Sequence, residues 1–301
     1  MTAMPTADSA SLISPTPYDW ERIPLEQGLI GSFRVTPDDP SFCDTGPAGG
    51  FLVFFPRTAT RVSPSGGVPY VLDSTVVTIR NRGQEATRTP IDPRGVDGQW
   101  FAISGSSALE IARSLDPRAE PERPFRFTHA PCPPELYLRQ RRLYLRARRG
   151  IATPLESSEG ILRLVAAVIG SAFATFSSAR GSARAPASDR THRDLAARAK
   201  EALAADLSGA FRLGDLAARL DVSPFHLCRV FRRETGTTLA RFHLDLRLCA
   251  ALDRLDAAHG DLTGLALDFG FSSHSHFSYE FRRRFGVPPR RALADRPVPI
   301  S

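Results

Sequence analysis

Two stretches of this sequence carry side chains suited to binding nucleic acid. Residues 221–236 read DVSPFHLCRVFRRETG, and residues 270–286 read GFSSHSHFSYEFRRRFG. Each stretch places aromatic, polar and arginine side chains within one helix length behind a serine. Arginine can donate two hydrogen bonds to guanine or pair with phosphate, and an aromatic ring can pack on the thymine methyl group. A helix that presents such side chains at its N-terminal half fits the major groove of DNA.

The two stretches belong to an internal repeat. Residues 216–217 align with residues 265–266, and Phe231 aligns with Phe281 once Ser273 is counted as one extra residue. Apolar residues four apart share one helix face, so the two helices of each copy can pack together through that face. The repeat therefore predicts two helix-turn-helix units. The alternative is two helical hairpins that only fold, with their arginines as solvated surface.

The residues at the turns agree with this interpretation. Asp221 and Gly270 stand where the first helix of each copy must end in a left-handed residue, a conformation that Gly and Asp tolerate. Ser223 and Ser273 are predicted to cap the second helices. Pro224 then occupies a first helical position, where its missing N–H costs nothing.

Side chains that point away from the buried face of each second helix are the candidate DNA contacts. In the first copy, Arg229 is placed to bind guanine and Phe225 to press on a thymine methyl group. Arginines further along are better placed for phosphate, which adds affinity without sequence information. The predicted phosphate contacts are Arg232, Arg233, Arg282, Arg283 and Arg284.

Composition favours a polyanionic partner without identifying one. The 301-residue chain has a formal net charge of +7 and an isoelectric point near 9.8, but Lys200 is its only lysine, so arginine is preferred everywhere. No apolar run approaches the ~18 residues of a membrane span, and the N-terminus lacks the features of a secretory signal. Cys43, Cys132, Cys228 and Cys249 form no CxxC pair, which argues against disulfides or zinc and favours a reduced cytoplasm.

The elements that must position these side chains follow from the hydrophobic pattern. Short apolar runs between turn residues over 50–130 predict an antiparallel sandwich or small barrel. Apolar residues three and four apart over 135–176 predict two amphipathic helices. Residues 177–191 have the composition of a linker, and residues 192–293 are predicted to be helical almost throughout. Aromatic residues that could line a pocket, or could simply form the core, are Trp20, Phe33, Phe51, Phe54, Phe55, Tyr70, Trp100 and Phe101.

Three stretches together resemble the DNA-binding domain of the AraC/XylS family of transcription regulators. They are LGDLAARLDVSPFHLCRVFRRETG, TLARFHLDLRLCAAL and LALDFGFSSHSHFSYEFRRRFGVPPRRAL, within about 195–293. The resemblance implies two helix-turn-helix units joined by a long helix over 238–258, reading major-groove segments one helical turn, ~34 Å, apart. Arg247 then has a structural role in that helix. The base contacts that the resemblance implies are Phe225, Cys228, Arg229, His274, Ser275, Ser278 and Tyr279.

The N-terminal region is similar, more loosely, to the cupin-like sensing domains of that family. His129 is the only histidine between residues 50 and 130, so the histidine cluster of a metal-dependent cupin cannot form, and we expect neither metal nor cofactor. The expected fold is α+β and multidomain, with a cupin-like β-barrel plus two helices and an all-α domain with tandem helix-turn-helix motifs. The expected divisions are a disordered arm (1–20), a β sensor or scaffold (21–134), dimerisation helices (135–178), a linker (179–192) and the DNA-binding domain (193–295).

These observations predict a cytoplasmic, sequence-specific transcription regulator that acts as an activator and is not an enzyme. The chain has no GxSxG, HExxH, Walker or GxGxxG motif. The expected partners are double-stranded promoter DNA, a second copy in a homodimer, RNA polymerase and a small-molecule effector, with no membrane. Two alternatives stay open, a DNA-binding regulator without a ligand and a barrel enzyme with an accessory DNA-binding domain.

Overall fold

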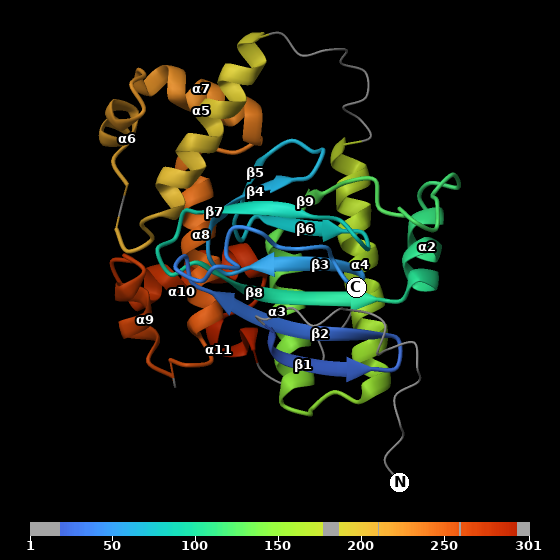
Figure 1. Ribbon diagram of the computed structural model, residues 1–301. Helices are drawn as coiled ribbons and strands as arrows, with labels where there is room; N and C mark the ends of the chain where they lie inside the picture. Colours follow the sequence, from blue (N-terminus) through green and yellow to red (C-terminus); the bar gives the residue numbers. More distant parts are fainter. Residues whose placement is uncertain (1–18, 177–186, 210, 259, 294–301) are drawn as a thin grey trace.

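The computed structural model describes residues 19–176, 187–209, 211–258 and 260–293 (Figure 1). The strands are β1 (Asp19–Leu25), β2 (Gly28–Val35), β3 (Phe51–Pro56), β4 (Thr60–Pro64), β5 (Tyr70–Leu72), β6 (Val76–Arg80), β7 (Ala86–Pro90), β8 (Val96–Ile103) and β9 (His129–Pro131). The helices are α2 (Gly105–Arg113), α3 (Pro134–Arg148), α4 (Pro154–Phe176), α5 (Ala187–Ala204), α6 (Leu213–Arg219), α7 (Pro224–Thr235), α8 (Leu239–Arg254), α9 (Leu262–Asp268), α10 (His274–Phe285) and α11 (Pro289–Ala292).

The strands form two antiparallel sheets. One sheet has the order β1-β2-β8-β3-β6-β9 and the other has the order β5-β4-β7. Alternate residues of β3 point to opposite sides, so Val53 and Phe55 join one hydrophobic core while Leu52 and Phe54 join the other. The register of β8 places Trp100 opposite Phe54. The two faces of the larger sheet are therefore both buried, one against the smaller sheet and one against helices.

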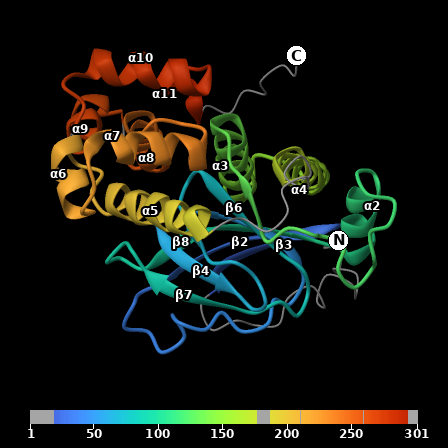
Figure 2. The ribbon, with the colours of Figure 1, turned by 90° about the horizontal axis from the view of Figure 1, so that it is seen from above.

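Helices α3 and α4 cover the face of the larger sheet that is turned away from the smaller sheet, as Figure 2 shows. In α4, Ile161, Leu164, Val165 and Val168 are fully buried. By length and composition, α4 is also the described helix that is apolar enough to cross a bilayer, with a mean hydropathy of 1.5. Its buried face packs on the sheet and on α3, which is the position of a core helix.

The described elements agree with the predicted order of strands, two helices and a helical region, with several differences. Strands β1 and β2 and helix α2 extend beyond the predicted pattern, and the run FRFTH forms a strand only at His129. Helix α2 has nine residues with Ala108 and Ala112 buried, too short for its period to stand out from the surrounding serines. The predicted arm (1–20) and linker (179–192) fall largely outside the described residues, and α5 begins at Ala187, inside the predicted linker.

The helical region does not have one core of its own. The core of the larger sheet, α3 and α4 continues into α8, α9, α10 and α11, where Leu252, Phe269 and Phe281 belong to it. A second cluster holds α5, α6, α7 and the start of α8, with Phe231 and Phe242 at its centre. The two predicted helix-turn-helix units are thus buried in different hydrophobic cores.

Candidate nucleic-acid interface

Helices α6 and α7 form the first helix-turn-helix unit. Leu216 and Leu220 are buried on α6, and the chain turns through Asp221, which has a left-handed φ of 56°. Ser223 is the N-cap of α7, and its Oγ accepts a hydrogen bond from the backbone N–H of His226 at 3.3 Å. Arg212, at the N-cap of α6, makes no side-chain capping bond. Hydrogen bonds within the turn therefore fix where α7 begins.

Helices α9 and α10 repeat this geometry. The chain turns through Gly270 at a φ of 66°, and Ser273 Oγ accepts from the backbone N–H of His276 at 3.1 Å. A Cβ on Gly270 would lie 2.5 Å from the carbonyl oxygen of Ser208, so a side chain cannot be accommodated there without a shift. Both second helices end at a left-handed glycine, Gly236 and Gly286. The two units are structurally equivalent at the turn, the cap and the end of the second helix.

The N-terminal halves of α7 and α10 face solvent. Phe225 is 79% exposed and Tyr279 is 64% exposed, the largest aromatic side chains among the exposed hydrophobic residues of the described chain. Cys228 and Arg229 are exposed beside Phe225 on α7. These four side chains lie on the outer faces of their helices, where a DNA groove has access to them.

On α10, the predicted base contacts are arranged differently from those on α7. Ser275 is exposed, whereas His274 and Ser278 are half-buried and their Nε2 and Oγ atoms lie 3.2 Å apart. A base that binds either side chain would have to compete with this contact. His276 lies outside the set, with its Nδ1 3.2 Å from Ser272 Oγ, and it braces the turn.

One of the predicted phosphate contacts faces inward. Arg232 and Arg282 are exposed, and Arg233 and Arg283 are more than half exposed beside Glu234 and Glu280 on their own helices. The guanidinium of Arg284 instead pairs with Asp245 of α8 at 2.7 Å, and its side chain is only 25% exposed. Residue 284 follows Phe277 and Phe281 by seven and three residues, which returns it toward the buried face, so the predicted phosphate contact of Arg284 would have to compete with this ion pair.

Helix α8 connects the two units and is anchored to the second. Arg247 Nε donates to the carbonyl oxygen of Phe269, and its guanidinium lies 4.3 Å from the centre of the Phe271 ring. Arg254 pairs with Asp268 at 2.8 Å on the surface. Arg247 therefore has the structural role that the sequence implied, holding the turn of the second unit against the connecting helix.

The same helix is clamped to the sheet domain by a buried polar cluster. Asp253 of α8 accepts a hydrogen bond from Tyr137 Oη at 2.6 Å, and its carboxylate oxygens lie 3.5 Å from Arg141 Nε and 3.6 Å from Arg57 Nε. Arg141 Nη2 also donates to the Asp253 carbonyl oxygen at 3.1 Å. Tyr137 and Arg141 belong to α3, and Arg57 follows β3. Three side chains from two segments of the N-terminal region thus converge on one carboxylate of the helical region.

Each unit also contacts the N-terminal region by itself. Arg142 of α3 donates through Nε to the carbonyl oxygen of Ala292 in α11, at 2.6 Å, beside the second unit. Arg61 of β4 pairs with Glu201 of α5, beside the first unit. The N-terminal region therefore contacts a helix beside each unit and the helix between them, while side chains on the outer faces of α7 and α10 stay exposed.

Asp245, at the junction of α8, α10 and α3, predicts a pH dependence of stability. Burial raises the pKa of Asp245 to about 6 and nearby Glu135 and Glu280 add to this, although Arg284 and Arg241 oppose it. A carboxyl whose pKa is higher in the folded state binds its proton more tightly there, so its contribution is present below about pH 4 and is lost as the pH rises to about 6. In wild type, this contribution to the free energy of unfolding should fall by about 2 kcal/mol over that window.

Asp245→Asn should remove that slope. Denaturant unfolding of wild type and variant at intervals from pH 4 to pH 7 gives the difference in unfolding free energy directly. The variant also loses its ion pairs, which changes its unfolding free energy by the same amount at every pH. The diagnostic quantity is therefore how the difference in unfolding free energy between wild type and variant changes with pH. Parallel curves would show that Asp245 titrates as it does in the unfolded chain.

The similarity in sequence to known proteins covers about a third of the chain. Residues 216–295 match the family model of a helix-turn-helix domain. An HTH-type transcriptional regulator of Mycobacterium tuberculosis is 36% identical over 89 residues, 29% of this chain and 34% of that protein. The HTH-type transcriptional regulator GbdR of Pseudomonas aeruginosa is 33% identical over 94 residues, 31% of this chain and 26% of GbdR.

A solved structure of a probable AraC family transcriptional regulator from Rhodopseudomonas palustris is similar to part of this chain. It is 25% identical, with 33% of this chain and 94% of that chain covered and a TM-score of 0.31. This chain spans about a third or less of the length of the two curated relatives. The similarity in sequence therefore belongs to the helix-turn-helix region.

Proposed function

We propose that the whole chain is a sequence-specific transcription regulator of the AraC type, on the premise that residues 216–295 match a helix-turn-helix domain. It binds promoter DNA by placing α7 and α10 in two neighbouring segments of the major groove. The observation that carries the proposal is the equivalence of the two helices. Both begin at a serine cap, both end at a left-handed glycine, and both present aromatic and polar side chains to solvent.

The residue roles follow from exposure and position. The side chains proposed to contact bases are Phe225, Cys228 and Arg229 on α7, and His274, Ser275, Ser278 and Tyr279 on α10. Those proposed to contact phosphate are Arg232, Arg233, Arg282 and Arg283. Cys228 is small and a weak donor, so the discrimination by α7 rests mainly on Arg229 and Phe225.

Arg229→Ala should weaken binding at one base pair of the target. Loss of a bidentate contact to guanine costs about 1–3 kcal/mol, and binding to targets altered at that base pair should change much less. The measurement is the affinity of the full chain for a selected target, for the same target with each base pair changed in turn, and for random DNA. An equal loss on specific and random DNA would contradict the assignment.

Arg232→Ala is the matched control, one helical turn further along the same helix. We expect it to weaken binding to every sequence alike and to reduce the dependence of affinity on salt by about one unit of slope. A variant pair that behaves identically in both respects would show that neither arginine reads a base.

The target itself can be found by selection. Fragmented genomic DNA incubated with the full chain at ~150 mM salt, which screens weak phosphate-only contacts, is recovered and sequenced. We expect a motif of two short boxes about one helical turn, ~34 Å, apart. Uniform recovery would reduce the function to non-specific DNA binding.

We further propose that the N-terminal region is a cupin-like sensing domain that modulates DNA binding. Its two facing sheets enclose a cavity, and its clamp on α8 together with its contacts to both units supports this role. Because α7 and α10 are exposed while these contacts are intact, an effector would act by shifting the population between relative orientations of the two units. It would not act by uncovering a hidden DNA-binding surface.

The remaining parts of the proposal concern partners. A homodimer through α3 and α4 is supported by the outer side of α4, where Leu155 is 60% exposed and Leu162 is partly exposed. Sedimentation of the full chain with and without target DNA tests whether it forms this dimer.

We propose that the protein acts in the cytoplasm as an activator that contacts RNA polymerase and has no catalytic role of its own.

A further inference from the structure

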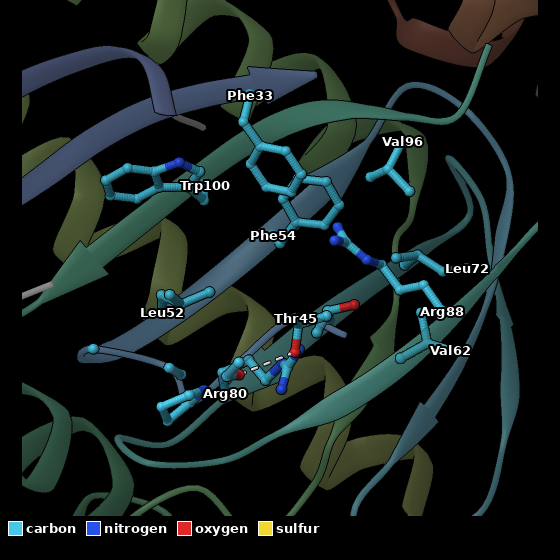
Figure 3. Close-up of a pocket in the computed structure, with 15 residues that line it drawn as sticks. Phe33, Thr45, Leu52, Phe54, Val62, Leu72, Arg80, Arg88, Val96 and Trp100 are labelled. Atoms are coloured by element: carbon cyan, nitrogen blue, oxygen red, sulfur yellow. Dashed lines mark hydrogen bonds between the residues drawn. The ribbon is translucent and has the colours of Figure 1, made fainter. Parts of the chain in front are cut away.

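A cavity lies between the larger sheet and the smaller one, away from the helices (Figure 3). Its volume is about 120 Å3. The walls are apolar for the most part, and the side chains that define them are Phe33, Leu52, Phe54, Val62, Leu72 and Trp100. The cavity belongs to the N-terminal region alone and is remote from α7 and α10 in sequence and in function.

Two glycines let the aromatic walls of the cavity lie flat on the sheet. A Cβ on Gly31 of β2 would stand 2.2 Å from the Trp100 indole, and a Cβ on Gly98 of β8 would stand 2.5 Å from the Phe54 ring. Phe54 in turn stacks on Phe33, with the ring centres 5.0 Å apart and the planes 19° from parallel. The three rings lie on one face of the larger sheet and form one wall of the cavity, and a wall of flat rings favours an occupant with a flat apolar face.

Arg80 is the exception to this apolar lining. Its Nη2 donates to Thr45 Oγ1 at 2.8 Å and its Nη1 donates to the carbonyl oxygen of Gln84 at 3.0 Å, and both acceptors are uncharged. Within the described part of the chain, no carboxylate pairs with Arg80. Burial lowers the pKa of this guanidinium from its ordinary value, though not enough to discharge it at neutral pH. Buried charges in proteins are normally neutralised by a partner.

Arg88, the other arginine at the cavity, serves a different purpose. It donates to the carbonyl oxygens of Phe42 at 2.8 Å and Ser41 at 3.1 Å, and its guanidinium lies 5.4 Å from the centre of the Phe42 ring. These bonds tie the segment between β2 and β3 to β7. Arg88 is buried, whereas Arg80 is partly exposed, so Arg80 is the more accessible of the two arginines that line the cavity.

We propose that this cavity binds a small aromatic monocarboxylate, with its ring against Phe33, Phe54 and Trp100 and its carboxylate on Arg80. A cavity of about 150 Å3 holds one benzene ring, so the present one is matched to a single ring and not to two. One guanidinium balances one negative charge, whereas a phosphate would bring up to two into an apolar site. This identifies the class of effector for the sensing domain of the proposed function, but binding to the cavity does not itself depend on DNA binding.

The test is calorimetric titration of the full chain with phenylacetate and with phenylacetamide, which has the same shape without the charge. We expect phenylacetate to bind more tightly than the amide by about tenfold or more, the range of a charge-assisted hydrogen bond. Octanoate is titrated alongside. A comparable affinity for octanoate and phenylacetate would overturn the requirement for a ring, and equal affinity for acid and amide would overturn the role of Arg80.

Variants distinguish the effect of the Arg80 charge on binding from the effect of the cavity volume. Arg80→Gln should abolish the preference for acid over amide. Leu52→Trp, which fills the cavity and leaves every charge in place, should weaken the acid and the amide together. Arg34→Gln is the control, because Arg34 lies on β2 beside the cavity but pairs with Asp97 at 2.7 Å and is 60% exposed. The affinity of this variant for phenylacetate should equal that of the wild type. Thermal unfolding of each variant establishes that it is folded.

Failure of this inference is distinguishable from failure of the proposed function. Affinity for the selected DNA target is measured on the same preparations with and without phenylacetate. No binding of any acid with DNA binding intact would overturn the cavity assignment alone. Binding of phenylacetate that is lost in Arg80→Gln would support the cavity assignment even if the chain recognised no DNA sequence.

Discussion

Replacing Asp253 by alanine should lower the free energy of unfolding of the full chain by about 3–5 kcal/mol. The carboxylate is 4% exposed and lies between Arg57 and Arg141, with Tyr137 Oη donating to it at 2.6 Å. Removing it leaves the Arg141 guanidinium, itself 6% exposed, buried with only carbonyl acceptors. An unpaired buried charge costs far more than the net worth of the pair, which is why the expected effect is large.

Denaturant unfolding measures this change, with Asp268→Ala as the matched control. Asp268 also pairs with an arginine of α8, Arg254, but the two side chains are about half exposed, so its removal should cost at most about 1 kcal/mol. Asp253→Asn keeps the shape and removes the charge. Similar small losses for Asp253→Ala and Asp268→Ala would contradict a buried clamp between α8 and the N-terminal region.

Phe231→Ala should cost about 3–5 kcal/mol of stability, concentrated in the first helix-turn-helix unit. Phe231 is fully buried, and its ring lies 5.5 Å from that of Phe242 in the core shared by α5, α6, α7 and the start of α8. That core is separate from the one that holds the second unit. We therefore expect protection of α6 and α7 amides from hydrogen exchange to fall while protection of α10 is retained.

The DNA footprint gives a second readout of the same change. With the first unit loosened, protection of one of the two boxes should be lost and the other kept. Phe225→Ala is the control, because Phe225 is on the same helix and 79% exposed, so its loss should alter base preference without changing stability. Equal loss of protection in α7 and α10 would show that the two units unfold together.

The two predictions describe an asymmetry between units that look alike in sequence. The second unit shares its core with the sheet domain, since Phe277, Phe281 and Phe285 join the cluster that contains the sheet residues Phe55 and Phe101. The first unit is buried in a smaller cluster, which reaches the sheet domain through Ala59 and Ile91. A ligand that shifts the sheet domain would therefore act on the two units through different contacts and could change the orientation of α10 relative to α7.

Local rules accounted for most of the helical region. Ser223, Ser273, Asp221 and Gly270 stand in the structure at the caps and left-handed turns that their chemistry favours. The buried stripes were also predictable, because residues four apart on a short helix share a face whatever surrounds it. Arg284 follows the same rule, since its position on the helix places it toward that buried face.

The cavity and the clamp had no comparable local signal. Arg80 and Thr45 are far apart in the chain and meet only because β6 and the segment after β2 close on the same space. Aromatic residues at strand positions predict a core as readily as a pocket, so Phe33, Phe54 and Trp100 could not be singled out. Only the register of β2, β8 and β3, with Gly31 opposite Trp100, decides which rings line empty space.

The sequence by itself determined that this chain carries two capped helix-turn-helix units with polar and aromatic side chains on their exposed faces, because turns, caps and helix faces depend on residues within a few positions of one another. The tertiary structure decided how those units are held. Contacts between residues distant in sequence bury Asp253 among Arg57, Tyr137 and Arg141, place the two units in separate cores, and bring Arg80 to the cavity. Such contacts depend on packing across the whole fold, which no short pattern encodes.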